Sequence, residues 1–252
     1  MDDVPSDRSP NDAVAPANSH ADADRLDPAL IRHALRAGAM ESARPLARGN
    51  QGWVFGLTIN GRRLVVKTPA GGLASALHRR ALAREARAYA RLRGVPGFAT
   101  CHGLFDRRWL VLDELAARPF REAMSDDGRS DGFSDGFSDG FSDGFADEFF
   151  DGLLQTIRAM HARGVAHGDL KRKSNLLVGD DGRPRIIDLG TAVVRRDRFA
   201  PVNHALFRTL AQTDLNAWIK LKYGGYDGVE EADRGLLRPT WPERIARRFR
   251  RR

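Results

Sequence analysis

The clearest chemical signal in the chain lies in residues 164–194, GVAHGDLKRKSNLLVGDDGRPRIIDLGTAVV. This stretch contains a histidine, a lysine, an amide and two carboxylates in a suggestive order: His167, Asp169, Lys171, Asn175 and Asp188. Amide and carboxylate oxygens suit Mg²⁺, and an ammonium group can offset charge on a phosphate during its transfer. The residue types and their order therefore predict phosphoryl transfer from Mg·ATP to a hydroxyl group.

Each of these side chains suits one task in such a reaction, because phosphoryl transfer needs positioning and charge stabilisation above all. We expect Asp169 to orient or deprotonate the acceptor hydroxyl and Lys171 to reach the γ-phosphate. Asn175 would bind Mg²⁺ through its amide oxygen, and Asp188 would bridge the metal to the phosphates. His167 is expected to hold the loop by hydrogen bonds.

Regular elements are expected on both sides of this loop. Residues 146–163 have apolar side chains at i, i+3, i+4 spacing, which predicts a core helix. The apolar positions are Phe149, Phe150, Leu153, Leu154, Ile157 and Met160. Residues 176–178 and 183–187 are typical of two strands around a glycine-rich turn, so Asn175 and Asp188 should lie at adjacent strand ends.

A second set of candidates stands upstream, in residues 47–69. The pattern predicts three strands joined by a glycine turn and a hairpin. Gly49 and Gly52 would let the backbone approach phosphates, Val54 could cover an adenine ring, and the last strand delivers Lys67. A plain hairpin turn is the alternative, since glycine pairs are common in turns.

Residues 73–93 are a strong helix candidate, with an apolar stripe at Leu73, Leu77, Ala81, Tyr89 and Leu92. Glu85 falls near this stripe and is the only acidic residue of the segment, which makes Lys67 an obvious partner. A solvated glutamate paired with Arg80 or Arg84 is the alternative. The order of glycine turn, lysine, helix and glutamate favours the pair with Lys67.

The apolar run at residues 109–115 predicts a buried strand that leads into a polar turn and links two lobes. Backbone groups at this strand end could receive the edge of an adenine ring. Glu114 and Leu115 are therefore candidate nucleotide-binding residues, although any strand end offers similar groups.

Farther along, residues 204–225 have a helical pattern with core candidates Leu206, Leu210, Leu215, Trp218, Ile219 and Leu221. Asp214 within this segment has two interpretations. It either braces the loop that carries Asp169, or caps a helix after Thr213.

Together these pieces resemble the protein-kinase-like superfamily, over about residues 47–191. The order is that of the superfamily: Ala-x-Gly-x-x-Gly-x-Val, a lysine, a glutamate, a linking strand, His-Gly-Asp-Leu, an asparagine and Asp-Leu-Gly. The His-Gly-Asp-Leu motif is most similar to the atypical branch of RIO-type kinases and bacterial lipopolysaccharide (Kdo) kinases. The resemblance implies ATP and Mg²⁺ as cofactors and an α+β, two-lobed fold with a small antiparallel N-lobe sheet and a reduced helical C-lobe.

The sequence departs from that pattern at three points. Ala47 stands where the first glycine of the phosphate loop would be, and Asn175 follows Asp169 by six residues where the family has five. No Ala-Pro-Glu motif follows Asp-Leu-Gly, and 64 residues remain after Asp188. We therefore expect the chain to lack the activation segment with which ordinary protein kinases bind peptides.

The resemblance implies a phosphotransferase with a hydroxyl acceptor, in the first instance a RIO-like serine/threonine protein kinase. A lipopolysaccharide or sugar kinase is an alternative enzyme. A pseudokinase, which binds without turnover, is the alternative from another class. The presence of Lys67, Glu85, Asp169, Asn175 and Asp188 favours an enzyme.

The expected organisation has a disordered acidic tail at residues 1–25, an N-lobe at 26–115 and a C-lobe at 116–252. A short helix capped by Asp27 should open the N-lobe. A low-complexity insertion at 126–146 contains four Ser-Asp-Gly-Phe repeats, whose glycines argue against a helix. An interaction segment that uses the phenylalanines is the alternative for the repeats.

The net charge of +8 is unevenly distributed: residues 1–25 carry −4 and residues 126–151 carry −8, which leaves +20 for the rest. Such a basic body favours anionic partners. Six arginines stand in the last nine residues, as a solvated tail or as a contact with an anionic membrane surface. Nucleic acid is not the expected partner, because no DNA-reading helix, zinc spacing or RNA-binding signature is present.

Cysteine usage and hydropathy indicate the compartment. Cys101 is the only cysteine, so no internal disulfide can form, and no apolar run approaches the roughly 18 residues of a membrane span. We expect a cytoplasmic protein that is peripheral at the membrane if its basic end binds there.

Overall fold

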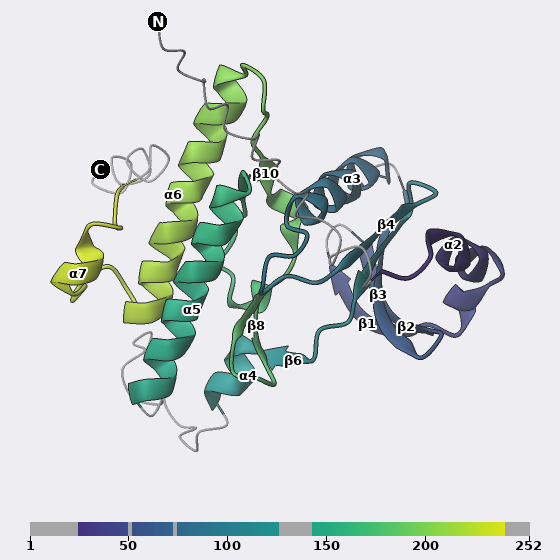
Figure 1. The fold of residues 1–252 in the computed structure, drawn as a ribbon, viewed down its shortest axis with the longest axis horizontal. Coiled ribbons are helices and arrows are strands. Elements are labelled where there is room, and N and C mark those ends of the chain that lie inside the picture. Colours follow the sequence, from purple (N-terminus) through teal and green to yellow (C-terminus); the bar gives the residue numbers. More distant parts are fainter. Residues whose placement is uncertain (1–24, 50–51, 73–74, 126–142, 240–252) are drawn as a thin grey trace, which may run out of the picture.

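The structure is a computed structural model that describes residues 25–49, 52–72, 75–125 and 143–239 of the chain. Figure 1 shows an N-terminal part built on a β-sheet beside a C-terminal part dominated by long helices. The α+β class is as predicted, and the order of a five-stranded antiparallel sheet followed by helices is consistent with a kinase-like fold.

The N-terminal sheet has the strand order β1-β2-β3-β5-β4 and is antiparallel throughout. Its strands are β1 (Arg44–Gly49), β2 (Gly52–Ile59), β3 (Arg62–Pro69), β4 (Cys101–Phe105) and β5 (Trp109–Asp113). Asn60 and Gly61 join β2 to β3 with φ angles of 48° and 76°, the left-handed conformations that a two-residue hairpin requires. The predicted three strands of residues 47–69 are therefore confirmed.

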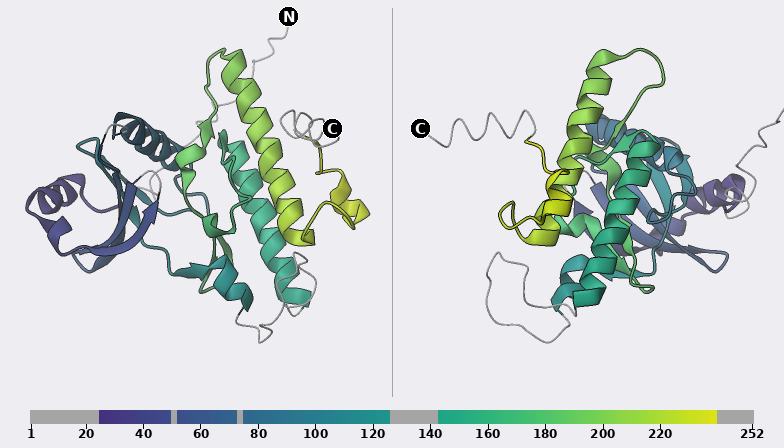
Figure 2. Two further views of the ribbon diagram at one scale, coloured as in Figure 1. Left: turned by 180° about the vertical axis from the view of Figure 1, so that it is seen from behind. Right: turned by 60° about the vertical axis from the view of Figure 1, so that its left-hand side comes forward.

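Two helices cover opposite faces of this sheet, as Figure 2 shows. Helix α2 (Pro28–Arg36) begins at Asp27, whose carboxylate accepts a hydrogen bond from the Ala29 N–H, as predicted. Its Ile31 and Leu35 pack on the outer face with Val111 of β5. Helix α3 (Ser75–Arg91) packs on the inner face, where the neighbouring β5 residues Leu110 and Leu112 point.

The buried stripe of α3 differs from the predicted one at its start. Leu82, Glu85, Ala88 and Tyr89 are buried, whereas Leu77 is 63% exposed. Leu77 has helical spacing, but the first turns of α3 contribute none of the buried residues, so periodicity alone misplaced it. Leu73 lies outside the described residues.

The C-terminal part contains helices α4 (Phe120–Ser125), α5 (Asp143–Ala162), α6 (Pro201–Tyr223) and α7 (Glu231–Arg234). A small sheet joins β6 (Ala117–Pro119), β8 (Leu176–Gly179) and β9 (Pro184–Ile186), and a two-stranded ladder joins β7 (Val165–Ala166) to β10 (Val193–Val194). Short 3-10 turns lie at η2 (Lys173–Asn175) and η3 (Leu189–Thr191), and a third, η1 (Ala39–Glu41), lies between α2 and β1 in the N-terminal part. The predicted strands on either side of the 179–183 turn are confirmed.

Helix α5 is the core helix predicted from its apolar stripe, and all six predicted positions are buried. It begins at Asp143, so the last Ser-Asp-Gly-Phe repeat runs into the helix. This corrects the expectation that the whole repeat segment avoids helical structure. The first three repeats, residues 1–24 and the arginine-rich end at 240–252 lie outside the described residues.

Helix α6 lies against α5, and the Trp218 indole N–H donates to the Phe150 carbonyl at 2.7 Å. Trp218, Ile219 and Leu221 are buried as predicted, but Leu206 is 47% exposed and Phe207 is buried in its place. The start of α6 extends past the end of α5 (Figure 1). Phe207 contacts the His161 ring of α5, and Leu206, one position earlier, points to a different face of the helix. In the described part of the chain, no helix is long and apolar enough to cross a membrane.

Candidate active site

Lys67 and Glu85 form an ion pair between β3 and α3. The Lys67 ammonium lies 2.5 Å from a Glu85 carboxylate oxygen, and their side chains are only 17% and 4% exposed. Both neighbours expected in the alternative lie elsewhere: Arg80 is exposed, and Arg84 points to another loop. The structure thus brings together the two residues that the sequence order paired.

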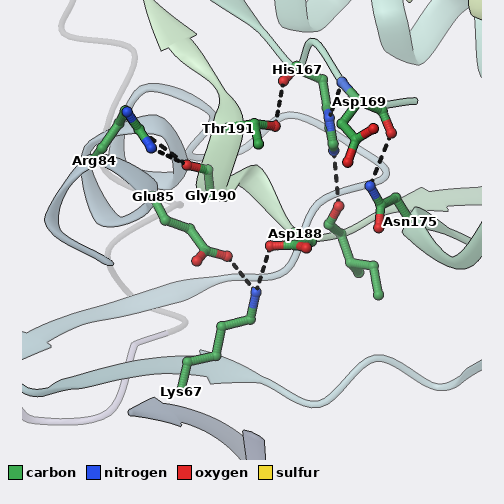
Figure 3. A network of polar contacts seen from close by, with 10 residues as sticks. Lys67, Arg84, Glu85, His167, Asp169, Asn175, Asp188, Gly190 and Thr191 are labelled. Atoms are coloured by element: carbon green, nitrogen blue, oxygen red, sulfur yellow. Dashed lines mark hydrogen bonds and ion pairs between the residues drawn. The ribbon is translucent and has the colours of Figure 1, made fainter. Parts of the chain in front are cut away.

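The same ammonium group also faces Asp188, at 3.5 Å (Figure 3). Burial alone would lower the pKa of Lys67, but the Glu85 and Asp188 carboxylates outweigh burial and raise it. Burial also raises the pKa of Glu85, against the opposing effect of Lys67. We take the charged pair as the resting state, because a proton on Glu85 would deprive a buried ammonium of its nearest counter-charge.

Asp188 stands in a conformation that few residues adopt. Its φ and ψ angles of 62° and 65° are left-handed, and its side chain is 54% exposed. Aspartate and asparagine tolerate this region better than other side chains, at a cost of about 1–3 kcal/mol. The backbone turn at Asp188 directs its carboxylate toward Lys67 while the following residues enter η3.

The loop that carries Asp169 is held by hydrogen bonds from within. The buried His167 ring contacts the Ile187 carbonyl through Nε2 at 3.0 Å, and its Nδ1 accepts from the Asp169 N–H at 3.2 Å. The tautomer with its proton on Nε2 satisfies both contacts. The Asn175 amide nitrogen donates to the Asp169 carbonyl at 3.0 Å. His167 therefore has the structural position expected of it.

Asp214 braces this loop from the middle of α6. It is fully buried, and its two carboxylate oxygens accept from the backbone N–H groups of His167 and Gly168, each at 2.8 Å. The His161 ring lies 3.0 Å from the same carboxylate. Of the two interpretations left open, bracing fits, and the helix cap does not, because α6 begins at Pro201.

Two further contacts connect α3 to η3, and η3 to the loop that carries Asp169. The sequence analysis predicted neither of them. The Arg84 guanidinium donates to the Gly190 carbonyl at 2.6 and 3.1 Å, and the Thr191 hydroxyl donates to the His167 carbonyl at 3.0 Å. Arginine 84 lies next to Glu85, so one helix turn contacts both Lys67 and the segment after Asp188 (Figure 3). A local sequence pattern cannot predict the contact between Arg84 and Gly190, because the two residues are 106 positions apart.

Asp169 has a neighbour that the sequence did not single out. The Arg172 guanidinium lies 3.1 Å from its carboxylate, and the Asp169 side chain is 29% exposed. Lys171 lies on the surface of the same loop. The loop contains Lys171, Arg172 and Lys173, and residue type alone does not indicate which of them meets Asp169.

Three of the predicted nucleotide-binding residues lie on β1 and β2, the two strands on one side of β3, which carries Lys67. Val54 pairs with Lys67 across β2 and β3, and Gly49 pairs with Gly52 at the end of β1 and β2. A side-chain carbon at Gly52 would lie 1.8 Å from the Thr68 carbonyl oxygen, so this position requires glycine. Residues 50 and 51, at the tip of the turn, lie outside the described residues.

Directly after β5, the strand expected to link the two lobes, one backbone N–H group already has a hydrogen-bond acceptor. The Glu114 N–H donates to the Arg63 carbonyl at 3.1 Å, and the Glu114 carboxylate faces Arg44 and Arg63. An adenine edge would therefore meet the Glu114 carbonyl and the Leu115 N–H, not the Glu114 N–H. Of the backbone groups of Glu114, only the carbonyl oxygen therefore stays a candidate for binding adenine.

The donor set suits a magnesium ion shared with a nucleotide. Among the described residues no group of three or more His, Cys, Asp and Glu side chains could hold a metal ion alone. Mg²⁺ commonly takes one or two protein oxygens, with phosphates and water completing its shell. Because the Asn175 amide nitrogen donates to the Asp169 carbonyl, its oxygen is the atom left for a metal. Backbone pairing of β8 with β9 and the Ile187 N–H bond to the Asn175 carbonyl place Asn175 beside Ile187, the residue that precedes the exposed Asp188.

A separate cavity of about 570 Å³ lies on the side of α3 away from these residues. Tyr89, Phe98 and Cys101 are among its lining residues. Burial raises the pKa of the Cys101 thiol to about 11. The cavity shares none of the predicted site residues, so it does not define the candidate active site.

The chain is distantly similar to known serine/threonine-protein kinases. No protein-family model matches the chain. Forty residues are 48% identical to serine/threonine-protein kinase 16 of Homo sapiens and of Mus musculus, over 16% of this chain and 13% of each relative. A stretch of 164 residues is 31% identical to serine/threonine-protein kinase AfsK of Streptomyces griseus, over 62% of this chain and 18% of that relative.

The chain therefore spans less than one fifth of the length of these curated relatives. It is distantly homologous to serine/threonine protein kinases, which supports a relationship to the protein-kinase-like superfamily. These relatives do not bear on the RIO-type or Kdo-kinase branch.

Proposed function

We propose that the chain is an ATP- and Mg²⁺-dependent phosphotransferase that moves the γ-phosphate of ATP to a hydroxyl acceptor. The observation that carries the proposal is the connected set of ion pairs from Glu85 through Lys67 to Asp188, with contacts of 2.5 and 3.5 Å. A buried lysine held between two carboxylates is suited to bind a phosphate chain beside a metal ligand. The distant homology to serine/threonine kinases supports the same chemistry.

On the donor side, Lys67 would contact the ATP phosphates while Glu85 fixes the direction of its ammonium group. Asn175 and Asp188 would hold Mg²⁺, which when bound offsets charge on the phosphates. Gly49 and Gly52 would let the backbone approach these phosphates. The attraction between Lys67 and Glu85 is strong because both side chains are largely shielded from water.

The adenine and the acceptor have their own candidates. Val54 would cover the adenine ring, and the Glu114 carbonyl with the Leu115 N–H would meet its edge. Asp169 would orient the acceptor hydroxyl and take its proton, and Lys171 would reach the γ-phosphate. The Arg172 contact with Asp169 would have to open or rearrange when an acceptor enters.

For the acceptor, our first proposal is a serine or threonine of a protein, as in RIO-like protein kinases. The names of the distant relatives support protein phosphorylation. A lipopolysaccharide or sugar hydroxyl is the second candidate, which the expected lack of a peptide-binding segment and the arginine-rich chain end both allow. A cytoplasmic location, with the arginine-rich end at an anionic membrane, is part of this proposal.

A binding module without turnover is the alternative from another class. Lys67, Glu85, Asp169, Asn175 and Asp188 are all present, which favours an enzyme that turns over. Transfer of phosphate from ATP is the property that distinguishes an enzyme from such a binding module.

The test is transfer of labelled γ-phosphate by the full chain in the presence of Mg²⁺, with a casein-like protein and a lipid-linked sugar as parallel acceptors. Label in protein alone supports the first candidate, and label in sugar alone supports the second. ATP binding without any transfer supports the pseudokinase. Asp169→Asn serves as the control for contaminating kinases, and failure to bind Mg·ATP at all would refute the proposal.

A further inference from the structure

Three exposed apolar side chains gather where the chain enters α6. Phe199, Val202 and Leu206 are 90%, 82% and 47% exposed. Val202 and Leu206 are one helical turn apart and share a face, and Phe199 directly precedes the helix. Single exposed apolar residues are ordinary, but a cluster of three on neighbouring positions indicates an interaction surface.

The loop before α6 is fixed in this arrangement by hydrogen bonds. The Asn203 side chain accepts from the Arg196 N–H at 2.8 Å and donates to the Val194 carbonyl at 3.1 Å. The His204 ring lies 2.8 Å from the Arg196 carbonyl. These contacts anchor the loop to the first turn of α6, and the Phe199 side chain between them stands exposed.

Arginines surround the apolar cluster on both sides. Arg195, Arg196, Arg198 and Arg208 are exposed, and residues 193–209 contain one acid, Asp197. Asp197 is itself paired with Arg91 of α3 at 2.5 Å. The immediate surroundings of the three apolar side chains are therefore strongly positive.

Helix α3 extends this positive surface. Arg80, Arg84, Arg87 and Arg91 recur every three or four residues, so they lie on one face of α3, and all are exposed. The contacts of Arg84 with Gly190 and of Arg91 with Asp197 join that face to the chain around β10. Figures 1 and 2 show α3, β10 and the loop before α6 as neighbours.

We propose that this surface, which we name the α6-entry surface and define by residues 195–208 with the arginine face of α3, docks on an anionic phospholipid bilayer. Phe199 and Val202 would enter the boundary between head groups and acyl chains, and the arginines would lie among the head groups. Apolar side chains flanked by arginines are the combination that binds such an interface. The phosphates of a nucleic acid would pair with the arginines, but they would give the exposed Val202 side chain no apolar environment.

The docking surface involves residues other than the arginine-rich chain end, and it does not depend on the proposed phosphotransferase activity. It adjoins the candidate site through Arg84, which contacts the Gly190 carbonyl.

The first test is co-sedimentation of the full chain with phosphatidylcholine vesicles, with and without about one third phosphatidylglycerol. We expect binding to the anionic vesicles, and a fall of about tenfold or more in the partition coefficient for Phe199→Ser/Val202→Ser. Leu46→Ser, a change of an exposed apolar residue on β1, is the matched control and should bind like the parent. Equal binding by parent and double variant would overturn the proposal.

A second test separates this surface from net charge. Arg196→Glu/Arg198→Glu and Arg107→Glu/Arg108→Glu change the net charge equally, but the latter pair lies in the β4–β5 turn beside α2. Only the first pair should abolish vesicle binding. Equal losses would assign binding to overall charge and contradict the proposal. So would a dimer in sedimentation that Phe199→Ser dissociates while vesicles stay unbound, because the surface would then be a self-association interface.

Discussion

The Arg84 guanidinium donates two hydrogen bonds to the Gly190 carbonyl, at 2.6 and 3.1 Å, from the residue that precedes Glu85. Glu85 in turn holds Lys67, and Gly190 lies two residues after Asp188. A rotation of α3 that breaks the pair with Lys67 would therefore also strain the segment that positions Asp188. The two halves of the candidate ATP site are coupled through one helix turn.

This coupling predicts the effect of Arg84→Ala. Loss of two charge-assisted hydrogen bonds at a partly exposed site should cost about 1 kcal/mol of unfolding free energy and loosen η3. We expect faster hydrogen exchange at the amides of residues 189–192 and a raised KM for ATP. Arg80→Ala, a change of an exposed arginine one turn earlier, should alter neither quantity. Unchanged exchange in Arg84→Ala would show that the contact does not hold the segment.

A second prediction concerns Asp214, whose carboxylate accepts two backbone N–H bonds in a buried position. Asp214→Asn places an NH₂ group against donors, so at least one hydrogen bond is lost and the buried donor is left unsatisfied. We expect a loss of about 2–3 kcal/mol in unfolding free energy by denaturant titration. Asp227→Asn, on the surface, should change stability by less than about 0.5 kcal/mol. A neutral Asp214→Asn would refute the bracing role.

A third prediction concerns acid stability and Asp113, which accepts hydrogen bonds from Arg62 at 2.7 Å and contacts His102 at 2.8 Å. Burial would raise the pKa of Asp113, but the hydrogen bonds from His102 and Arg62 prevail and lower it to about 2. The folded-state pKa thus lies below the ordinary value of 3.8. The stabilisation is present above that ordinary value and is lost as the pH falls toward 2.

We therefore expect Asp113→Asn to remove about 1–2 kcal/mol of unfolding free energy at pH 6, after allowance for partial exposure. The difference from the parent should shrink as the pH is lowered from 4 toward 2. Urea titrations across this range measure it, with Asp180→Asn as an exposed control. A difference that stays constant with pH would contradict the assignment.

The sequence predicted those parts of the site that depend on residue type and order. Glu85 is the only acid in its helix, so its pairing with Lys67 followed from the pattern, and the strands around the 179–183 turn brought Asn175 near Asp188. The contact of Arg84 with Gly190 did not follow, because a surface arginine has many possible acceptors and packing alone selects one.

Two leucines account for the errors in burial. Leu77 stands in the first turns of α3, which contribute none of the buried residues, and Leu206 points away from the face of α6 on which its neighbour Phe207 is buried. Periodicity identifies the face of a helix and does not reveal how far a neighbouring element extends along it. The last Ser-Asp-Gly-Phe repeat entered α5 for a related reason: tertiary packing of a long apolar helix overrides the weak propensity of one glycine.

The central claim is that Asp188 holds Mg·ATP while Asp169 acts on the acceptor, and calorimetric titration of Mg·ATP into the full chain and two variants tests it most directly. Asp188→Asn keeps a residue that tolerates the left-handed conformation, so its effect reports the lost charge and not the backbone. We predict at least a tenfold weaker Kd for Mg·ATP in Asp188→Asn, and a Kd close to the parent's in Asp169→Asn, which should nevertheless have lost γ-phosphate transfer. Parent-like Mg·ATP affinity in Asp188→Asn together with parent-like transfer in Asp169→Asn would contradict the account.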